Sequence, residues 1–171
     1  RQSPQSVVTG VGILGGGQLG AVLAAALQKL GAEVSVYDPD PDAPALSRVG
    51  RAMTAPWNDR VALERFLRGC DVLTYEFENV EGAVLGQLAR GVPIIPSLAV
   101  LETTQHRIRE KNFLAAQQLP HVAFRAVEHA ADLTEATRDF GLPAILKTAR
   151  GGYDGHGQRR LSDEAELAAA A

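Results

Sequence analysis

The chain has 171 residues, of which 46% are hydrophobic, enough for one sizeable core or for one domain and the beginning of another. Its net charge of -3, with Lys and Arg residues dispersed along the sequence, argues against a nucleic-acid partner, because such binding needs a basic face. The apolar runs are too short for a membrane helix, no signal-peptide pattern opens the chain, and Cys70 is the sole cysteine, so we expect a cytoplasmic protein with no membrane partner and no internal disulfide.

The first half of the chain alternates predicted strands and helices. An apolar run ending at Leu14 predicts a strand, a glycine-rich turn follows, and residues 21–27 open the first helix, which Gly31 ends. Further strands are predicted over 33–37, 51–54, 72–75 and 93–95, and further helices over 60–68 and 81–90. This alternation predicts right-handed βαβ units, and therefore an α/β fold with a doubly wound parallel sheet.

In the second half of the chain, the predicted strands and helices no longer alternate regularly. Two successive helical patterns, over 97–104 and 105–119, follow each other with no strand between them. After them we predict strands over 122–126, 144–148 and 158–161, a helix over 130–140 and a last helix beginning at Ser162. We therefore expect a doubly wound domain over 1–97, a helical connector over 98–120, and over 121–171 the first part of a second domain. That part is too small to be complete, so we expect a longer parent protein.

The first glycine-rich turn fits a dinucleotide-binding pattern. Gly15, Gly17 and Gly20 have the spacing G-x-G-x-x-G, which lets backbone N–H groups at a helix N-terminus approach a phosphate. Asp38 follows about 20 residues later, where such domains keep the acid that binds a ribose 2′-OH. This interpretation predicts a nicotinamide-dependent oxidoreductase. Alternatively, the glycines serve only helix–strand packing, and Asp38 only initiates a turn before Pro39.

The second glycine-rich stretch favours a different ligand. Lys147 ends a predicted strand and precedes the glycines of 151–157, an arrangement that offers a triphosphate a point cation and several N–H donors. It is not a Walker loop, because the glycines follow the lysine. Since an unpaired lysine inside an apolar run would be costly to bury, we expect Lys147 to have an anionic partner.

Four segments together carry a resemblance to a known family. They are Gly-Gly-Gly-Gln-Leu-Gly at 15–20, Tyr-Glu-Phe-Glu-Asn-Val at 75–80, Arg-Ile-Arg-Glu-Lys-Asn at 107–112, and Gly-Gly-Tyr-Asp-Gly-His-Gly-Gln at 151–158. In this order they resemble the N5-carboxyaminoimidazole ribonucleotide synthetases of the ATP-grasp superfamily, over essentially the whole chain. The resemblance implies a Rossmann-like pre-ATP-grasp domain followed by the start of an α+β ATP-grasp domain.

The resemblance also implies a reaction in de novo purine biosynthesis. ATP, bicarbonate and 5-aminoimidazole ribonucleotide would give N5-carboxyaminoimidazole ribonucleotide, ADP and phosphate, with Mg²⁺ bridging the ATP phosphates. The family's magnesium ligands lie beyond residue 171, so the resemblance implies no metal ligand in this chain, and we expect the chain alone to be inactive. A homodimer is compatible with the sequence, which does not determine the oligomeric state.

Carried over position by position, the resemblance implies two sets of site residues. The residues implied for ATP are Arg107, Lys147, Gly151, Gly152, Tyr153, Asp154, Gly155, His156, Gly157 and Gln158. The residues implied for the aminoimidazole ribonucleotide are Gly17, Gln18, Leu19, Glu76, Tyr153, Asp154 and His156. One position departs from the family, which usually has Arg or Lys where this chain has His156, so a permanent cation is replaced by a residue whose charge depends on pH.

Simpler interpretations of these residues stay open. The charged residues Arg107, Arg109, Glu110 and Lys111 could form the solvated face of a helix, and Glu76 could cap a turn at a strand end. Beside the ligase and the oxidoreductase, a third hypothesis is a non-catalytic nucleotide-binding module, for which absent magnesium ligands would be part of the design.

Overall fold

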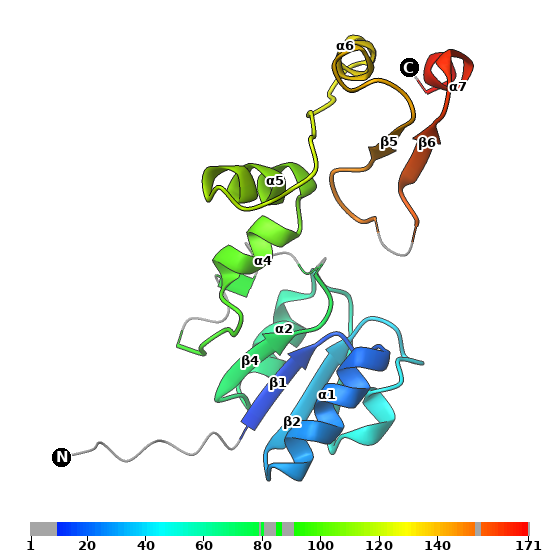
Figure 1. Ribbon diagram of the computed structural model, residues 1–171. Coiled ribbons are helices and arrows are strands. Elements are labelled where there is room, and N and C mark those ends of the chain that lie inside the picture. Colours follow the sequence, from blue (N-terminus) through cyan, green and yellow to red (C-terminus); the bar gives the residue numbers. More distant parts are fainter. Residues whose placement is uncertain (1–9, 79, 81–84, 87–90, 153–154, 171) are drawn as a thin grey trace, which may run out of the picture. The chain divides into compact units, whose positions relative to one another are not determined.

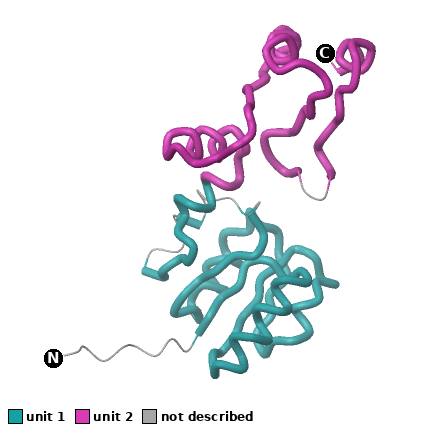
Figure 2. The backbone as a smooth tube through the Cα atoms, in the orientation of Figure 1, with its two compact units in different colours: residues 1–102 teal, residues 103–171 magenta. Residues whose placement is uncertain are grey.

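The computed structural model describes residues 10–78, 80, 85–86, 91–152 and 155–170, and it divides into two compact units. Unit 1 comprises residues 1–102 and unit 2 comprises residues 103–171 (Figure 2). The division falls within helix α4 (Leu98–Thr104). Each unit has its own sheet and its own hydrophobic core, and each is described separately.

Unit 1 is built on a parallel sheet of four strands in the order β3-β2-β1-β4 (Figure 1). The strands are β1 (Gly10–Leu14), β2 (Glu33–Asp38), β3 (Arg51–Thr54) and β4 (Val72–Tyr75). This confirms the doubly wound parallel sheet predicted from the alternation of elements. The short fifth strand predicted at 93–95 is reduced to a single parallel bridge between Leu73 and Ile94.

The helices of unit 1 follow the predicted order. They are α1 (Gln18–Lys29), a single 3-10 turn (Leu46–Arg48) and α2 (Arg60–Leu67), with most of α4 at the end of the unit. The Asp59 side chain caps α2, because its carboxylate accepts a hydrogen bond from the Ala62 N–H at 3.0 Å. The helix predicted over 81–90 lies mostly outside the described residues, of which Leu85 and Gly86 are helical.

Successive residues of the central strands enter cores on opposite faces of the sheet. Ile13 and Val36 belong to a cluster with Ala21 and Ala24 of α1. The next residues, Leu14 and Tyr37, belong to a second cluster, which includes Leu63, Phe66 and Leu67 of α2. A parallel sheet covered on both faces needs strands that are apolar throughout, and all five residues of β1 are buried.

Two tyrosines of unit 1 bury their hydroxyl groups in different ways. The Tyr37 O–H donates to the Pro56 carbonyl at 2.6 Å, and its ring contacts Trp57 and Phe66. Burial, with a smaller contribution from the Asp59 carboxylate, raises the pKa of Tyr37 to about 12. The hydroxyl of Tyr75 is also buried, and it has no hydrogen-bond partner among the described residues.

This contrast predicts opposite results from the same chemical change. We expect Tyr37→Phe to lower the free energy of unfolding by about 1–2 kcal/mol, because it removes a buried hydrogen bond and leaves the Pro56 carbonyl without its donor. Tyr75→Phe removes an unpaired buried hydroxyl and should be neutral or stabilising. Urea unfolding of both variants tests this, and equal losses of stability would contradict it.

The described residues of unit 2 after α4 form an antiparallel pair of strands and three helices. They are α5 (Arg107–Ala116), α6 (Ala130–Phe140), β5 (Ala144–Lys147), β6 (Gln158–Leu161) and α7 (Glu164–Ala168). The register pairs Ala144 with Leu161 and Lys147 with Gln158. Leu133 of α6, Leu161 of β6 and Leu167 of α7 form the core of the unit, against which Leu146 packs. Helices therefore cover one face of the two-stranded sheet.

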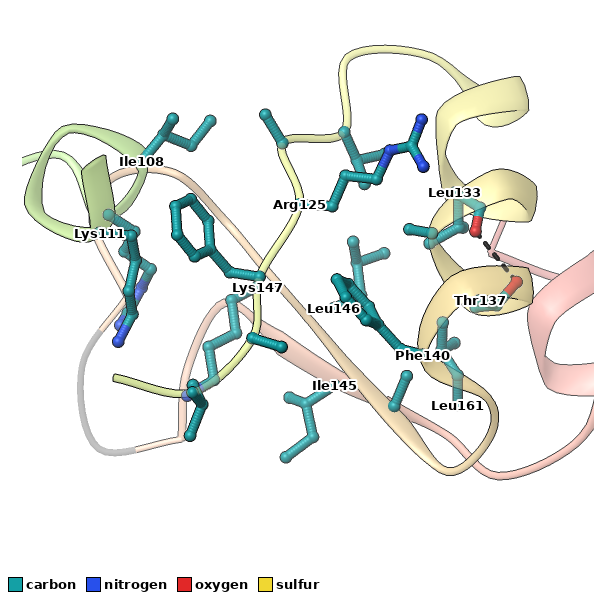
Figure 3. Close-up of a pocket in the computed structure, with 18 of the residues that line it drawn as sticks. Ile108, Lys111, Arg125, Leu133, Thr137, Phe140, Ile145, Leu146, Lys147 and Leu161 are labelled. Carbon is teal, nitrogen blue, oxygen red and sulfur yellow. Dashed lines mark hydrogen bonds between the residues drawn. The ribbon is translucent and has the colours of Figure 1, made fainter. Parts of the chain in front are cut away.

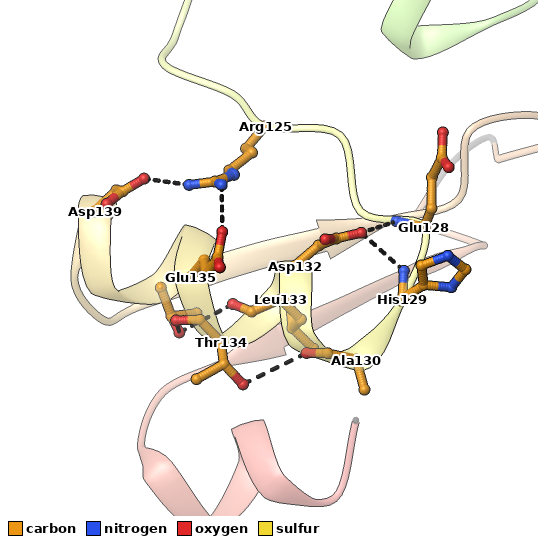
Figure 4. Close-up of polar contacts among 10 residues, drawn as sticks. Arg125, Glu128, His129, Ala130, Asp132, Leu133, Thr134, Glu135 and Asp139 are labelled. Atoms are coloured by element: carbon orange, nitrogen blue, oxygen red, sulfur yellow. Dashed lines mark hydrogen bonds and ion pairs between the residues drawn. The ribbon is translucent and has the colours of Figure 1, made fainter.

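Polar contacts hold α6 in unit 2 (Figure 4). The Asp132 carboxylate accepts from the backbone N–H groups of Glu128 and His129, both at 2.9 Å, and these bonds lower the pKa of Asp132. The Arg125 guanidinium pairs with Glu135 at 2.6 Å and with Asp139. The segment that carries Arg125 thus connects to α6 through side chains.

The strand predicted over 122–126 does not form. This segment carries no regular secondary structure, and Phe124 is its one residue that is not exposed. The prediction followed from local composition, since Val122 and Phe124 favour strands. A strand also needs a partner with which to share backbone hydrogen bonds, and the register of unit 2 pairs only β5 with β6 among the described residues.

Candidate functional site

The first glycine turn is shaped by close packing against Glu76. Gly15 has a φ of +105°, and a Cβ there would lie 2.8 Å from Glu76 Oε2. A Cβ on Gly20 would overlap the Gly15 carbonyl oxygen. Gly17 precedes α1 with an extended backbone, and its Cβ would make only ordinary contacts. Two of the three pattern glycines are therefore required by the packing of helix against strand.

In a dinucleotide-binding turn, backbone N–H groups bind the pyrophosphate. Here the N–H groups of Gly15 and Gly16 instead donate hydrogen bonds to acceptors within the protein. The Gly15 N–H donates to the Tyr37 carbonyl at 3.0 Å, and the Gly16 N–H donates to Asp38 Oδ2 at 2.6 Å. Asp38 Oδ1 accepts from the Asp40 N–H at 2.8 Å, so both of its carboxylate oxygens are occupied. With two carboxylates beside the turn, a dinucleotide phosphate would meet negative charge, and the oxidoreductase hypothesis is not favoured.

Glu76 follows the end of β4 and lies against this turn. The Glu76 N–H donates to the Leu14 carbonyl at 2.8 Å. The ring of the next residue, Phe77, stacks on Trp57 with 5.7 Å between ring centroids. Burial of the side chain raises the pKa of Glu76, and the Asp38 and Glu78 carboxylates add to that effect. A carboxylate is an acceptor, so this side of the turn suits ligand hydroxyl or amino groups better than phosphate.

Three further residues implied for the substrate, Gly17, Gln18 and Leu19, lie at the start of α1. Gln18 and Leu19 form its first turn, and both side chains are exposed. Gly17, the residue before the helix, would carry a Cβ 3.5 Å from Glu76 Oε2. Glu76 is therefore close to the N-terminal end of α1, which the sequence did not determine from spacing alone.

Lys147 ends β5 on its exposed side. Residues alternate along this strand: Leu146 packs toward the core, whereas Ile145 and Lys147 are exposed. The expectation that Lys147 needs an anionic partner because it is buried is therefore wrong. The reason is that alternate residues of β5 differ in burial, and Leu146, not Lys147, packs against the core of Leu133, Leu161 and Leu167. The Lys147 side chain is exposed, so a ligand can reach it.

The second glycine loop is closed at its base by backbone hydrogen bonds. The Thr148 N–H donates to the Gly157 carbonyl at 2.8 Å, directly after the β5–β6 pair. Gly157 has a φ of +68°, and a Cβ there would overlap Thr148 Oγ1. Gly151 and Gly155 also have positive φ, at +73° and +86°. The loop therefore needs glycines for its backbone conformation and for close approach.

Arg107 reaches this loop from the start of α5. Its backbone N–H donates to the Ala149 carbonyl at 2.9 Å, and its guanidinium Nη2 donates to the Gly152 carbonyl at 3.0 Å. Of the other residues implied for ATP, Gln158 begins β6 opposite Lys147, and His156 is exposed within the loop. Tyr153 and Asp154 lie outside the described residues.

A cavity of about 980 Å³ lies in unit 2 between α5, the 122–127 segment, α6 and β5 (Figure 3). Apolar side chains such as Leu146 and Phe140 line one part of it. Arg107 and Lys147 line it as well, so the structure brings these two predicted residues together. Sequence reasoning missed Lys111, which also lines the cavity. Its spacing of four residues from Arg107 was the available signal, because such residues share a helix face.

Among the described residues, no group of three or more His, Cys, Asp or Glu side chains could hold a metal ion. No helix within the described ranges has the length and apolar character that crossing a membrane requires.

Comparison with protein families decides the membership of the chain. A model described as the ribonucleotide synthetase preATP-grasp domain matches residues 8–105, and the ATP-grasp domain matches residues 112–171. The chain belongs to the ribonucleotide synthetase pre-ATP-grasp family. The resemblance found in the four sequence segments is thereby confirmed, together with the assignment of an ATP-grasp segment after the first domain.

Two relatives are similar to this chain over most of its length. The N5-carboxyaminoimidazole ribonucleotide synthase of Staphylococcus aureus is 37% identical over 157 residues, covering 92% of this chain and 42% of the relative. The bifunctional purine synthesis protein purC/E of Dictyostelium discoideum is 40% identical over 158 residues, covering 92% of this chain and 16% of the relative. The chain thus spans less than half the length of these relatives.

Solved structures agree in fold. The S. aureus N5-carboxyaminoimidazole synthetase complexed with ADP has a TM-score of 0.90 and 36% identity, covering 95% of this chain and 43% of that one. The Aspergillus clavatus synthase in complex with ADP and 5-aminoimidazole ribonucleotide has a TM-score of 0.83 and 29% identity, covering 95% and 43%. Neither name describes an oxidoreductase, in agreement with the occupied N–H groups of the first turn.

Proposed function

We propose that this chain is the N-terminal part of an ATP-grasp ligase. The whole enzyme would convert ATP, bicarbonate and 5-aminoimidazole ribonucleotide to N5-carboxyaminoimidazole ribonucleotide, ADP and phosphate in purine biosynthesis. The observation that carries the proposal is the loop at 148–157, which is closed at its base and bonded to Arg107, a residue that lines one cavity together with Lys147. The chain is similar to synthases of this name. Because the chain is shorter than its relatives, turnover belongs to the full-length protein.

The proposed chemistry balances in two steps. A bicarbonate oxygen attacks the γ-phosphorus of ATP, ADP leaves, and carboxyphosphate forms. The exocyclic amine of the aminoimidazole then bonds to the carboxyl carbon, phosphate leaves, and the amine loses a proton. Lys147 and the backbone N–H groups of the glycine loop would hold the phosphates in place, because charge-assisted hydrogen bonds are the strong contacts available to a triphosphate.

On the substrate side, we propose that Glu76 accepts hydrogen bonds from the ribonucleotide. Its half-buried carboxylate beside the first turn of α1 suits the ribose hydroxyls or the amine. Gly17, Gln18 and Leu19 would contact the same ligand from the start of α1. Tyr153, Asp154 and His156 keep their proposed roles from the resemblance.

Three further proposals concern the metal ion, the cellular location and the oligomeric state. Mg²⁺ would supply charge neutralisation to the ATP phosphates. The described residues do not fit a site for this ion, since no group of three or more His, Cys, Asp or Glu side chains that could hold a metal occurs among them. We also propose a cytoplasmic location. A homodimer is compatible with the exposed apolar side chains of Leu19, Val22 and Leu30 at α1.

Thermal unfolding of the full-length protein tests the proposal. Ligand at 100 times its dissociation constant stabilises the folded state by about 2.7 kcal/mol, so ATP should raise the melting temperature and NAD should not. Phosphate release that requires both bicarbonate and the aminoimidazole ribonucleotide separates a ligase from a non-catalytic nucleotide-binding module. Stabilisation by NAD alone would overturn the proposal.

A further inference from the structure

Helix α5 presents two cations to the cavity of unit 2, one helical turn apart. Arg107 and Lys111 both line the cavity and are half-buried. Arg109, between them in sequence, is exposed and does not line it. The charged residues of this segment are therefore not equivalent, and the interpretation of all of them as one solvated helix face fails for Lys111.

Arg107 is already engaged with the loop backbone. Its Nη2 donates to the Gly152 carbonyl, and its backbone N–H donates to the Ala149 carbonyl, so one residue holds the loop at two points. The fit is close: a Cβ on Gly152 would lie 2.9 Å from the His156 carbonyl oxygen and 3.3 Å from Arg107 Nη2. Arg107 therefore acts on the conformation of the loop itself.

Lys111 has no such engagement. Its side chain forms no hydrogen bond or ion pair with another described residue. Figure 3 shows Lys111 projecting from α5 while Lys147 projects from β5. Asp139, an acid in the cavity lining, is paired with Arg125. Glu110 also lines the cavity, and it offsets part of the positive charge that Arg107, Lys111 and Lys147 bring.

We propose that α5 divides two tasks: Lys111 binds the phosphates of ATP, and Arg107 is a positioning residue that orders the glycine loop before ATP arrives. The inference rests on the proposed function, since the ligand of the cavity is taken to be ATP. It assigns to Lys111 a role that the motif at 107–112 did not reveal. A lysine suits this place as a flexible point charge, whereas the planar guanidinium of Arg107 suits the fixed carbonyl geometry.

Matched variants of the full-length protein test the binding role. Each of the two variants removes one positive charge from α5. Lys111→Gln removes it on the cavity side, and Arg109→Gln removes it on the exposed side. We expect Lys111→Gln to weaken ATP binding about tenfold in calorimetry, with a shallower dependence on salt, and to leave adenosine binding unchanged. Arg109→Gln should bind ATP like the parent, and Lys111→Arg should restore most of the affinity.

Hydrogen exchange without nucleotide tests the positioning role. Arg107→Lys keeps the charge but loses the planar fork, so the amides of Gly151, Gly152 and Gly155–Gly157 should exchange several-fold faster than in the parent. In Lys111→Gln they should exchange at the parent rate. A phosphate contact alone would leave exchange in the free protein unchanged in both variants.

The outcomes separate this inference from the function on which it rests. Equal ATP affinities for Lys111→Gln and Arg109→Gln would overturn the role of Lys111, and unchanged loop exchange in Arg107→Lys would overturn that of Arg107. A parent protein that binds no ATP would instead overturn the proposed function. Circular dichroism melts of each variant identify any loss of affinity that comes from unfolding.

Discussion

Replacing Lys147 with alanine should weaken ATP binding to the full-length protein by about 10–100-fold. The lysine supplies a charge-assisted contact to a phosphate, worth about 1.5–3 kcal/mol, and alanine supplies none. The fold should tolerate the change, because Lys147 is exposed at the end of β5 and its removal leaves no cavity in the core. Isothermal titration with ATP gives the affinity, and thermal unfolding confirms the fold.

Two controls sharpen this experiment. Lys29→Ala removes an exposed lysine from the end of α1, which does not line the cavity, and it should bind ATP like the parent. Leu146→Ala, one residue before Lys147, should instead destabilise unit 2, because Leu146 packs against the core of Leu133 and Leu161. If Lys29→Ala and Lys147→Ala gave the same affinity, the glycine loop would not be the site of the ATP phosphates.

The fold of unit 1 was predictable because local signals and tertiary packing agree there. The apolar run through Ile13 and Leu14 has residues for both faces of the sheet, and the structure gives each face its own core. The helix predicted over 60–68 forms as α2, and the residue before it, Asp59, is a typical cap whose carboxylate accepts from the Ala62 N–H. Such features depend on residues close in sequence or on a periodic pattern, which a sequence displays directly.

Unit 2 was less predictable because its features depend on what covers each face. Val122 and Phe124 favour a strand by composition, but composition cannot supply the partner strand. Lys147 lies in an apolar run, but its exposure follows from the packing of Leu146, the residue before it, against the core of Leu133 and Leu161. Both misjudged features required knowledge of neighbours distant in sequence.

The candidate site also has features that the sequence predicts and features that only the structure reveals. The sequence pattern gave the positions of Asp38 and the glycines, but not the bond from the Gly16 N–H to Asp38, which makes this acid part of the turn. In the sequence, Lys111 was one of several charged residues of a predicted helix, and nothing distinguished it from the others. The phase of α5, with Arg107 and Lys111 on the cavity side and Arg109 outside, is what distinguishes it.

Glu76→Gln should change stability and activity in opposite directions. Glu76 is half-buried beside Asp38 and Glu78, and burial and these carboxylates raise the pKa of Glu76. A carboxyl whose pKa is higher in the folded than in the unfolded protein stabilises the fold while it is protonated. That contribution is fully present below the ordinary pKa of a glutamate, near 4.3, and is lost as the pH rises through the raised value.

The raised pKa means that the folded protein disfavours the ionised form of Glu76, whereas glutamine is neutral with nearly the same shape. We expect Glu76→Gln to melt at a higher temperature than the parent at pH 7, and the difference to shrink toward zero as the pH falls to about 4. Glu33→Gln, at an exposed position that begins β2, is the charge-matched control and should follow the parent at every pH. A melting difference that does not vary with pH would contradict the electrostatic explanation.

The same substitution should impair the use of the ribonucleotide. Glutamine presents one carbonyl oxygen and an N–H₂ donor where the carboxylate presents two acceptors, so hydrogen bonds from ligand hydroxyl or amino groups weaken or are lost. We expect kcat/KM for 5-aminoimidazole ribonucleotide to fall at least tenfold, while the dissociation constant for ATP changes less than twofold. A stabilised variant with lower activity would indicate that the repulsive charge is retained at Glu76 for binding and not for folding. If kcat/KM were unchanged in the stabilised variant, Glu76 would be a structural acid and the first glycine turn would lose its assignment to substrate.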